Sequence, residues 1–447
     1  GVDVDSSGAA YVAGETNSSQ ASFPVATGFD TTYNGGGDAF VAKVSPDGVA
    51  LEWSAYLGGS NFDQAFDIAV DGAGAVYVAG QTISTNFPRV GGGTATYFRG
   101  GAHDAFVAKI APGGTSLEWS GYIGGYGDDR AHSIAVDSAG AAYLGGMTSS
   151  SQLTFPVTVG PDLTYGGGAY DAFVAKVKPD GSALEYSGYI GGSGDDQGYS
   201  VAVDSTGAAY LGGQTSSSEA TFPALGGPEL TYDGSYDGFV AKVNPAGTGL
   251  SYAGYVGGVA PDGIFGIALD SNGAAYVTGA TLSPEGSFPL VGGLDASYAG
   301  GILDGFVAKV NAAGTGLEYS GYIGGSGYDV GWGIDVDATG AAYVTGETAS
   351  NQSTFPVASG PDSTFNGGSL DAFVAKVDPA GSAFSYSGYI GGAGYDQGLA
   401  IAVDGTGAAY VSGETSSGQT SFPKLVGPDL TYNGGSADAF VAKVGAS

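Results

Sequence analysis

The sequence has no cysteine among its 447 residues, and it contains only two histidines and three arginines. The missing cysteines exclude disulfide bonds, thiolate metal sites and cysteine nucleophiles. Positive charge is also scarce, because 12 Lys and Arg residues stand against 44 Asp and Glu residues, for a formal net charge of −32. A field of this sign repels nucleic-acid phosphates and anionic lipid surfaces, so we expect no nucleic-acid partner. No apolar run approaches the roughly 18 residues of a membrane-spanning helix, so we predict no direct membrane insertion.

The chain is instead rich in apolar and turn-forming residues. Hydrophobic residues make up 43% of it and aromatic residues 12%, whereas charged residues make up only 13%. This balance predicts a packed core rather than an acidic disordered tail. The 86 glycines and 18 prolines indicate many tight turns. The chain begins at Gly1 without a signal-like segment, which is expected for a processed mature protein or for part of a longer one.

A sequence period of 66 or 67 residues runs through the whole chain. The phrase Asp-(Ala/Gly)-Phe-Val-Ala-Lys-(Val/Ile) occurs seven times, and so does a phrase of the form Val-Asp-x-x-Gly-Ala-Ala-Tyr-Val. The phenylalanines of the first phrase are Phe40, Phe106, Phe173, Phe239, Phe306, Phe373 and Phe440. A third phrase, of the form Leu-Glu-Tyr-Ser-Gly-Tyr-Ile-Gly-Gly, occurs only six times, beginning near residues 51, 117, 184, 250, 317 and 384. A fixed period of this length is typical of repeat architectures.

Each repeat contains four short runs rich in Val, Ile, Tyr, Phe and Ala, separated by clusters of Gly, Asp, Asn, Pro and Ser. This pattern predicts four antiparallel strands per repeat, which we name A to D. In one repeat we expect them at 133–137, 142–146, 171–177 and 184–190. Four strands repeated seven times predict an all-β fold, a seven-bladed β-propeller, with an open solenoid as the alternative. We expect a single domain over residues 1–447, with blades at about 1–66, 67–132, 133–199, 200–265, 266–332, 333–399 and 400–447.

The amino-acid sequence of the repeat resembles that of a known repeat family. The resemblance is carried by Tyr189-Ile190-Gly191-Gly192 and the residues that follow as far as Asp204, by Thr221-Phe222-Pro223, and by the segment 237–242. These phrases are similar to the bacterial seven-bladed β-propeller repeats called SBBP repeats, and the match covers essentially the whole chain. The resemblance implies a propeller in a secreted or cell-surface bacterial protein. It implies no defined chemistry, because the family lacks a common catalytic motif.

The seventh repeat is incomplete, because the chain opens at a strand A and stops just after the seventh strand C. The expected count is therefore 27 strands, and the outermost strand of the seventh blade is absent from this chain segment. Two explanations remain open. Residues upstream of Gly1 supply the missing strand, or blade seven presents an unpaired edge that a partner protein or a neighbouring copy fills.

Repeated carboxylates precede strand C or lie in the loops between strand D and the next strand A. The candidate ligands are Asp38, Asp63, Asp104, Asp128, Asp129, Asp171, Asp195, Asp196, Asp237, Asp304, Asp371 and Asp438. Hard cations take several oxygen ligands at once, so calcium is the cofactor that such a set could hold. In the alternative interpretation each Asp caps loop amides of its own blade, because a residue that the fold needs must recur in every blade.

The repeat is broken where the rare basic residues lie, because all three Arg and both His fall between residues 89 and 132. These residues could form a positive patch that docks an acidic neighbour or a carboxylate ligand, although both His replace aromatic or apolar residues and could simply pack. With three residues of the open blade, the predicted partner-binding set is Arg89, Arg99, His103, Arg130, His132, Phe440, Val441 and Lys443. The lysines of the first phrase are expected to pair with strand-D glutamates across the C–D hairpin.

No nucleophile elbow, triad-like context or phosphate-binding loop is present, so we predict that the protein is not an enzyme. The leading hypothesis is an extracellular or cell-surface scaffold, secreted by a bacterium, that assembles into a filament, adhesin or surface layer through the open blade edge. Its partners would be copies of itself or another cell-surface protein. The alternative is a lectin-like propeller that binds a polysaccharide or another ligand with Asp- and Tyr-rich loops, at residues such as Tyr170 and Asp171.

Overall fold

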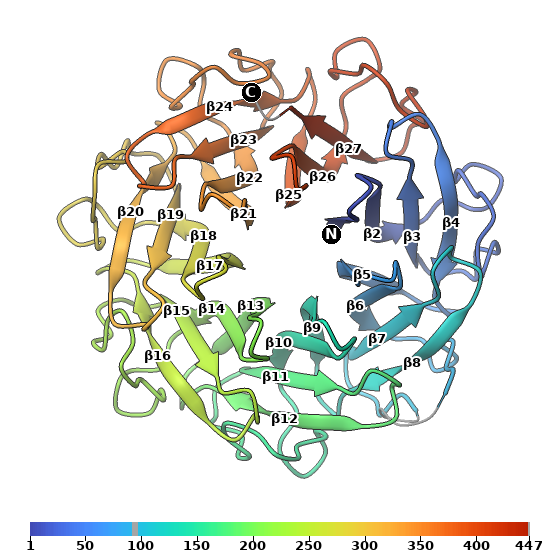
Figure 1. Cartoon of the computed structure of the whole chain (residues 1–447), viewed down its shortest axis with the longest axis horizontal. Coiled ribbons are helices and arrows are strands. Elements are labelled where there is room, and N and C mark those ends of the chain that lie inside the picture. Colours follow the sequence, from blue (N-terminus) through green and yellow to red (C-terminus); the bar gives the residue numbers. More distant parts are fainter. Residues whose placement is uncertain (92–96, 446–447) are drawn as a thin grey trace. The chain divides into compact units, whose positions relative to one another are not determined.

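The computed structural model describes residues 1–91 and 97–445, and these residues form 27 β-strands and no helix (Figure 1). The strands lie in seven sheets, and each sheet takes its strands in chain order. Six sheets have four strands and the seventh has three. This architecture confirms the predicted all-β, seven-bladed propeller in which the outermost strand of the seventh blade is missing.

The first three blades contain twelve strands. Blade one consists of β1 (Val2–Val4), β2 (Ala10–Thr16), β3 (Asp38–Val44) and β4 (Leu51–Leu57). Blade two consists of β5 (Asp63–Val70), β6 (Val76–Thr82), β7 (Asp104–Ile110) and β8 (Leu117–Ile123). Blade three consists of β9 (Asp129–Val136), β10 (Ala142–Thr148), β11 (Asp171–Val177) and β12 (Leu184–Ile190).

The remaining four blades contain fifteen strands. Blade four consists of β13 (Asp196–Val203), β14 (Ala209–Thr215), β15 (Asp237–Val243) and β16 (Leu250–Val256). Blade five consists of β17 (Asp262–Leu269), β18 (Ala275–Thr281), β19 (Asp304–Val310) and β20 (Leu317–Ile323). Blade six consists of β21 (Asp329–Val336), β22 (Ala342–Thr348), β23 (Asp371–Val377) and β24 (Phe384–Ile390). Blade seven consists of β25 (Asp396–Val403), β26 (Ala409–Thr415) and β27 (Asp438–Val444).

Residue contacts divide the chain into two compact units. The first unit holds Gly1–Leu225 and Ala241–Tyr252, and the second holds Gly226–Val240 and the chain from Ala253 onward. Blades one to three belong to the first unit and blades five to seven to the second, whereas β15 contributes residues to both. The prediction of a single domain over residues 1–447 stays a prediction, and its last two residues lie outside the described part of the chain.

Strands A and B are longer than the sequence pattern predicts. In blade three, strands C and D have the predicted bounds, but strand A begins at Asp129 rather than at residue 133, and strand B continues to Thr148 rather than to residue 146. The added residues pair with each other, Thr148 opposite Asp129 and Met147 opposite Arg130. The hydrophobic pattern does not predict these added residues as strand, because it cannot recognise a buried polar pair at a strand end.

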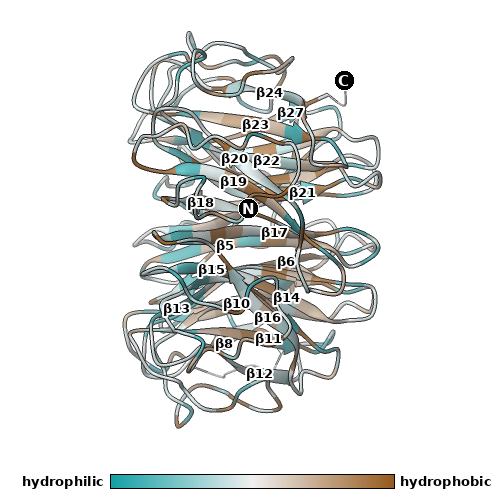
Figure 2. Cartoon of the chain, turned by 90° about the vertical axis from the view of Figure 1, so that its left-hand side faces the viewer, coloured by the Kyte–Doolittle hydropathy of each residue, from teal (hydrophilic) through white to brown (hydrophobic). Residues whose placement is uncertain are grey.

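Buried tyrosines link neighbouring blades within each unit. In the first unit, the hydroxyl of fully buried Tyr77 hydrogen bonds to the carbonyl of Gly140 in the next blade at 3.1 Å. In the second unit, Tyr343 makes the same bond to Gly407, also at 3.1 Å. Figure 2 shows hydrophobic residues along the strands and hydrophilic residues mainly in loops and at strand ends. Burial of one large apolar side chain contributes about 1.5–3 kcal/mol, so a ring repeated in each blade is a major source of cohesion.

A repeated glycine ends the turn between strands C and D, where its positive φ is required. Gly181 ends the turn that begins at Lys178, donates its N–H to the Lys178 carbonyl at 2.9 Å, and has a φ of +67°. A Cβ at this position would collide with the ring of Trp119 in the preceding blade. Gly48 occupies the equivalent position of blade one with a φ of +74°, but no atom lies within 4 Å of the place its Cβ would take.

We expect Gly48→Ala and Gly181→Ala to separate the backbone cost of this turn from its packing cost. A side chain in the left-handed region costs about 1–2 kcal/mol, and this is the only loss expected for Gly48→Ala. Gly181→Ala also overpacks the site against Trp119, which should lower the free energy of unfolding by about 1–3 kcal/mol more. Urea unfolding followed by tryptophan fluorescence measures both free energies of unfolding. Equal losses in the two variants would contradict the packing of this turn on Trp119.

Candidate functional site

Most of the predicted calcium ligands lie in pairs of aspartates. Each pair joins the first residue of a strand C to the first residue of the next strand A in the chain. The six pairs are Asp38 with Asp63, Asp104 with Asp129, Asp171 with Asp196, Asp237 with Asp262, Asp304 with Asp329, and Asp371 with Asp396. All twelve side chains are buried. The pairs therefore lie inside the protein, where each oxygen needs a hydrogen-bond donor or another compensating partner.

The strand-A aspartate of each pair is fully engaged by donors, as Asp129 illustrates. Its Oδ1 accepts a hydrogen bond from the Thr148 hydroxyl. Its Oδ2 accepts one from the Ser150 hydroxyl at 2.8 Å and one from the Gly125 amide at 2.7 Å. Thr148 ends strand B, and Gly125 follows strand D, so one carboxylate ties together three segments of the chain.

The strand-C aspartate is only half satisfied. In the same pair, Asp104 Oδ2 accepts a hydrogen bond from the Arg99 amide at 2.7 Å, whereas its Oδ1 has no hydrogen-bond partner within the described residues. A Cβ added to Gly124 would lie 2.6 Å from Asp104 Oδ1 and 3.0 Å from Asp129 Oδ2, so the Gly124 backbone fits beside both carboxyl groups. Burial, together with the charge of Asp129, raises the pKa of Asp104 to about 7.

The same half-satisfied carboxyl recurs in every complete blade. The unpartnered Oδ1 atoms within the described chain belong to Asp38, Asp104, Asp171, Asp237, Asp304 and Asp371. Burial raises the pKa of Asp38 to about 6 and that of each of the other five to about 7. One carboxyl of each pair is thus poised to hold a proton near neutral pH, while its neighbour stays bonded to hydroxyl and amide donors.

The remaining calcium candidates lie elsewhere. Asp128 contacts basic and phenolic groups, Asp195 accepts a hydrogen bond from Gln197 at 2.9 Å, and Asp438 accepts one from the Asn433 amide at 2.6 Å. No group of three or more His, Asp or Glu side chains in residues 1–91 and 97–445 is arranged to hold a metal ion. Calcium binding stays a prediction, and the geometry of the pairs is that of a hydrogen-bonded structural anchor.

We expect the protein to be more stable at pH 5 than at pH 8. Because burial raises the pKa of six carboxyls far above the unfolded value of 3.8, the folded chain binds more protons than the unfolded chain between these limits. The stabilisation is complete below pH 3.8 for these groups and is lost as the pH rises through 6 to 7. Melting temperature measured from pH 5 to pH 8 checks this, and a rise in melting temperature over that range would contradict it.

A matched pair of variants tests the assignment within one acid pair. Asp104→Asn keeps an acceptor for the Arg99 amide and removes the charge, so it should raise the free energy of unfolding at pH 8 by about 1–3 kcal/mol. Asp129→Asn turns an amide group toward hydroxyl and amide donors, so it should lower stability at both pH values by about 1–3 kcal/mol. The same melting curves with calcium or EDTA check the calcium prediction, which requires a calcium-dependent gain that Asp104→Asn removes.

Two of the rare basic residues, His103 just before β7 of blade two and Arg130 in β9 of blade three, pair with Asp128. Asp128 Oδ1 lies 2.8 Å from His103 Nδ1, and Asp128 Oδ2 accepts a hydrogen bond from Arg130 Nη2 at 2.7 Å. The Tyr170 hydroxyl donates to the same Oδ2 at 2.8 Å. Burial opposes ionisation of Asp128, but the hydrogen bonds from Arg130, Tyr170 and His103 lower its pKa. The sequence pattern missed this cluster because Asp128 was grouped with the repeated carboxylates.

His132 packs, as one of the two interpretations of the sequence proposes. Its ring lies 5.1 Å from the ring of Phe66 and stacks at 5.3 Å on Tyr199, and its Nδ1 lies 2.9 Å from the Gly198 carbonyl. Burial lowers the pKa of His132 to about 4, so the ring is neutral at physiological pH. Of the basic residues between 89 and 132, Arg89 is exposed and Arg99 half-buried, and their role in partner binding stays a prediction.

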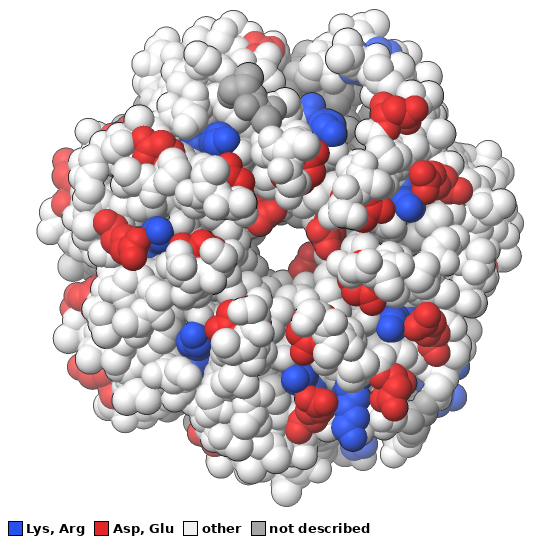
Figure 3. All heavy atoms as spheres, in the orientation of Figure 1, with Lys and Arg blue, Asp and Glu red and all other residues white. Residues whose placement is uncertain are grey.

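The repeated lysines form the predicted cross-strand ion pairs. Lys176 Nζ lies 3.0 Å from Glu185 Oε2 and 3.6 Å from Asp137 Oδ2, and it sits 4.9 Å from the centre of the Tyr143 ring. Equivalent Lys–Glu pairs occur in blades one, two and five. Figure 3 shows such blue and red side chains beside each other on one face. These partners hold the ammonium groups of the repeated lysines in ion pairs.

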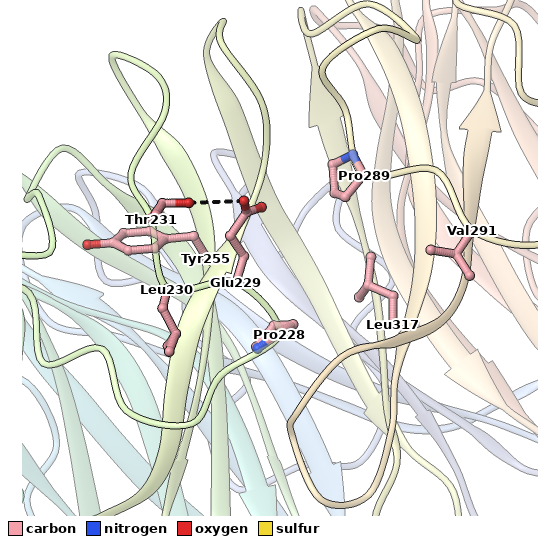
Figure 4. A pocket seen from close by; sticks show the side chains of 8 residues that line it. All are labelled: Pro228, Glu229, Leu230, Thr231, Tyr255, Pro289, Val291 and Leu317. Carbon is pink, nitrogen blue, oxygen red and sulfur yellow. Dashed lines mark hydrogen bonds between the residues drawn. The ribbon is translucent and has the colours of Figure 1, made fainter.

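The second unit contains a groove that the repeat pattern did not predict. Its volume is about 430 Å³, and its lining comes from the B–C loops and D strands of blades four and five. Leu230, Tyr255 and Leu317 supply apolar surface, and Thr231 donates a hydrogen bond to Glu229 at 3.1 Å (Figure 4). Burial raises the pKa of Glu229. Loops that vary between repeats shape this groove, so no periodic signal indicates it.

The loop between strands B and C covers the outer edge of strand D. In blade six, Ala358 donates its amide to the Ser387 carbonyl at 3.0 Å, and Tyr389 donates its amide to the Asp362 carbonyl at 2.9 Å. Bridges of the same kind join Val90 to Ser120 in blade two and Val291 to Ser320 in blade five. Backbone groups of an outer strand that would otherwise be open to pairing are thereby satisfied.

Blade seven lacks this arrangement. Strand β27 lies at the edge of its sheet and pairs only with β26 among the described strands. The Lys443 side chain is 46% exposed, against 17% for Lys376 at the same position of blade six. Leu425, which corresponds to Ala358, is 93% exposed. Phe440 is nevertheless buried, so of the three residues predicted for partner binding on β27, only Val441 and Lys443 offer accessible side-chain surface.

These features define a seven-bladed β-propeller whose last blade is open. Residues 52–88, 118–153 and 185–219 match the model of the SBBP family, described as a beta-propeller repeat. The resemblance inferred from the sequence is thereby confirmed.

One characterised relative and three solved structures resemble the chain more distantly. The "Regulatory protein FlaEY" of Caulobacter vibrioides is 26% identical over 388 residues, which cover 83% of this chain and 38% of that protein. The chain thus spans well under half the length of this relative. A protein of unknown function from Dyadobacter fermentans is 11% identical with a TM-score of 0.39, over 77% of this chain and 88% of its own. BamB from Moraxella catarrhalis is 10% identical with a TM-score of 0.35, over 84% and 90%. The Dos1 propeller is 8% identical with a TM-score of 0.42, over 92% and 89%.

Proposed function

We propose that the protein is a non-enzymatic scaffold of the bacterial cell surface or extracellular space, which assembles with other protein chains through the open edge of blade seven. The observation that carries the proposal is the exposure of β27 at the edge of its sheet. An unpaired strand presents a row of backbone donors and acceptors, which is a template for pairing with another chain. The secreted location rests on the resemblance to SBBP proteins.

The polar clusters of the protein support a binding role rather than catalysis. The buried aspartates are held by hydroxyl and amide donors, the lysines by carboxylates, and Asp128 by three side chains. Groups held in this way stabilise the fold but are not presented to a substrate. The relative from Caulobacter vibrioides carries the name of a regulatory protein, which is compatible with a binding function.

The lectin-like alternative finds less support at the residues named for it. The hydroxyl of Tyr170 is bonded to Asp128, and Asp171 is fully buried at the start of β11. A sugar-binding loop needs exposed polar groups beside an exposed aromatic face. These two residues do not provide such a surface.

Electron microscopy and sedimentation of the native protein test assembly through β27. We expect ordered multimers for the native chain and isolated particles for Ala439→Lys, because a charge on an exposed edge strand opposes pairing with another strand. Ala393→Lys is the matched control, since Ala393 is also exposed but lies in a loop. Assemblies that Ala439→Lys leaves intact, or a native protein that stays monomeric at high concentration, would refute the proposal.

A further inference from the structure

We propose that the open edge of blade seven is a binding site for a strand of defined sequence, of the form Leu-(Glu/Ser)-(Tyr/Trp)-Ser-Gly-Tyr-Ile, supplied by a partner polypeptide. This inference rests on the proposed function and deepens it, because it names the chemistry of the partner. It is argued from the six complete blades, whose D strands show what the edge of a strand C accepts.

The first step is the identity of the acceptor strand. Strand β27 has the sequence Asp-Ala-Phe-Val-Ala-Lys-Val, which is the sequence of β3, β11 and β23. In blade six, β23 pairs with β24, whose sequence is Phe-Ser-Tyr-Ser-Gly-Tyr-Ile, and in blade three β11 pairs with Leu-Glu-Tyr-Ser-Gly-Tyr-Ile. The third identical acceptor, β3, pairs with Leu-Glu-Trp-Ser-Ala-Tyr-Leu in β4, so the same acceptor sequence is paired with related D strands that share Ser at position four and Tyr at position six.

The second step is the register, which assigns a role to each residue of the partner. In blade three, Phe173 lies opposite Tyr189, Ala175 opposite Ser187, and Lys176 opposite Tyr186. The corresponding residues of blade seven are Phe440, Ala442 and Lys443, so they should face residues six, four and three of the incoming strand. This register is fixed by the alternation of side chains on a strand, since a slip of one residue would turn every side chain to the opposite face.

The third step is the side-chain chemistry at two of these positions. In blade three, Tyr189 packs against Phe155 with ring centres 5.5 Å apart, and Phe155 packs against Phe173 at 5.1 Å. Blade seven has the same pair of phenylalanines, Phe422 and Phe440, also at 5.1 Å. Lys443 is placed to meet a glutamate at position two, as Lys176 meets Glu185 at 3.0 Å. The site thus favours a tyrosine at position six and tolerates or favours an acid at position two.

The fourth step concerns the B–C loop, which lies on the side of the site opposite strand C. In blade six the D strand lies between β23 and the B–C loop, where Ala358 and Asp362 bond to its outer edge. The residues at the same positions of blade seven are Leu425 and Asp429, and Leu425 is 93% exposed, against 54% for Leu225 at the same position of blade four. A bound strand would therefore be held by backbone hydrogen bonds on both of its edges, which gives more affinity than addition to one edge.

The occupant comes from outside the described chain. The Leu-Glu-Tyr-Ser-Gly-Tyr-Ile type of segment occurs six times in the sequence, and all six copies are already the fourth strand of a blade. A second folded copy of this chain could offer only the edge of its own β27, which has a different sequence. The occupant that we propose is a separate polypeptide that carries a D-type segment.

Binding of a synthetic peptide tests this assignment on the complete chain. The probe is a fluorescent nonapeptide with the sequence of residues 184–192, Leu-Glu-Tyr-Ser-Gly-Tyr-Ile-Gly-Gly. We expect it to bind at least tenfold more tightly than a scrambled peptide, and a change of its sixth residue from Tyr to Ala should weaken binding about tenfold through the lost aromatic packing. Hydrogen exchange should show new protection at two segments, residues 439–444 and residues 425–429. Equal binding of the scrambled peptide, or protection at neither segment, would overturn the proposal.

A double-mutant cycle separates recognition from an unspecific effect on the fold. Lys443→Ala should weaken binding of the Glu-containing peptide about two- to fivefold and leave a peptide with Ser at position two unchanged, because the lost contact is an ion pair at the surface. Lys178→Ala, at an exposed lysine in the C–D turn of blade three, is the control and should affect neither peptide. Equal losses for both peptides would overturn the assigned register.

The outcomes also distinguish this inference from the proposed function. If native assemblies depend on Ala439 while the D-type peptide does not bind, the edge pairs with something else, such as the β27 of a second copy, and only the present inference fails. If neither the peptide nor Ala439→Lys has an effect, both proposals fail. Protection of β27 alone, without residues 425–429, would replace the two-sided site by simple edge addition and would also overturn the inference.

Discussion

The buried aspartate at the start of strand A is the interaction on which the rest of the fold depends. It appears as Asp129 in blade three, where a threonine, a serine and a glycine amide surround its carboxylate. A carboxylate removed from water is tolerated only when its oxygens are hydrogen-bonded, so this residue imposes its environment on blades two to seven. The Thr-x-Ser that follows strand B and the Gly-Gly that follows strand D recur for this reason. Many of the buried polar residues therefore serve as repeated hydrogen-bonded anchors of the fold.

The second aspartate of each pair adds a dependence on pH that few structural carboxyls have. Asp104 lies against the same glycine as Asp129, and one of its oxygens has no donor within the described residues. Burial and the neighbouring charge favour the protonated form of Asp104. A bound proton, rather than a positive side chain, thereby neutralises this carboxyl group. The chain has only 12 basic residues, and seven of its nine lysines are already held in ion pairs with Asp or Glu.

Blade seven differs from the other blades in what covers its edge, not in its own sequence. In complete blades, strand D lies between strand C and the B–C loop, which hydrogen bonds to part of its outer edge. In blade seven the same acceptor residues are present, but Leu425 and Lys443 are exposed. Because the acceptor is identical to those of the closed blades, its preference for a partner can be derived from the protein itself. The C–D strand pairs of the complete blades thereby indicate which strand sequence β27 would accept.

The sequence by itself determined the period, the four-strand repeat, the seven blades and the absence of one strand, because each follows from local patterns of apolar residues and turns. It also identified the Lys–Glu pairs, since a hairpin brings neighbouring strands together in a known register. Only the tertiary structure decided which aspartates meet, because Asp104 and Asp129 belong to different blades and approach each other around Gly124. It likewise decided that Asp128 pairs with His103 and Arg130, and that strand A of blade three begins at Asp129, four residues before the predicted start. Those outcomes depend on contacts between segments distant in sequence and on burial, and neither leaves a periodic signal in the chain.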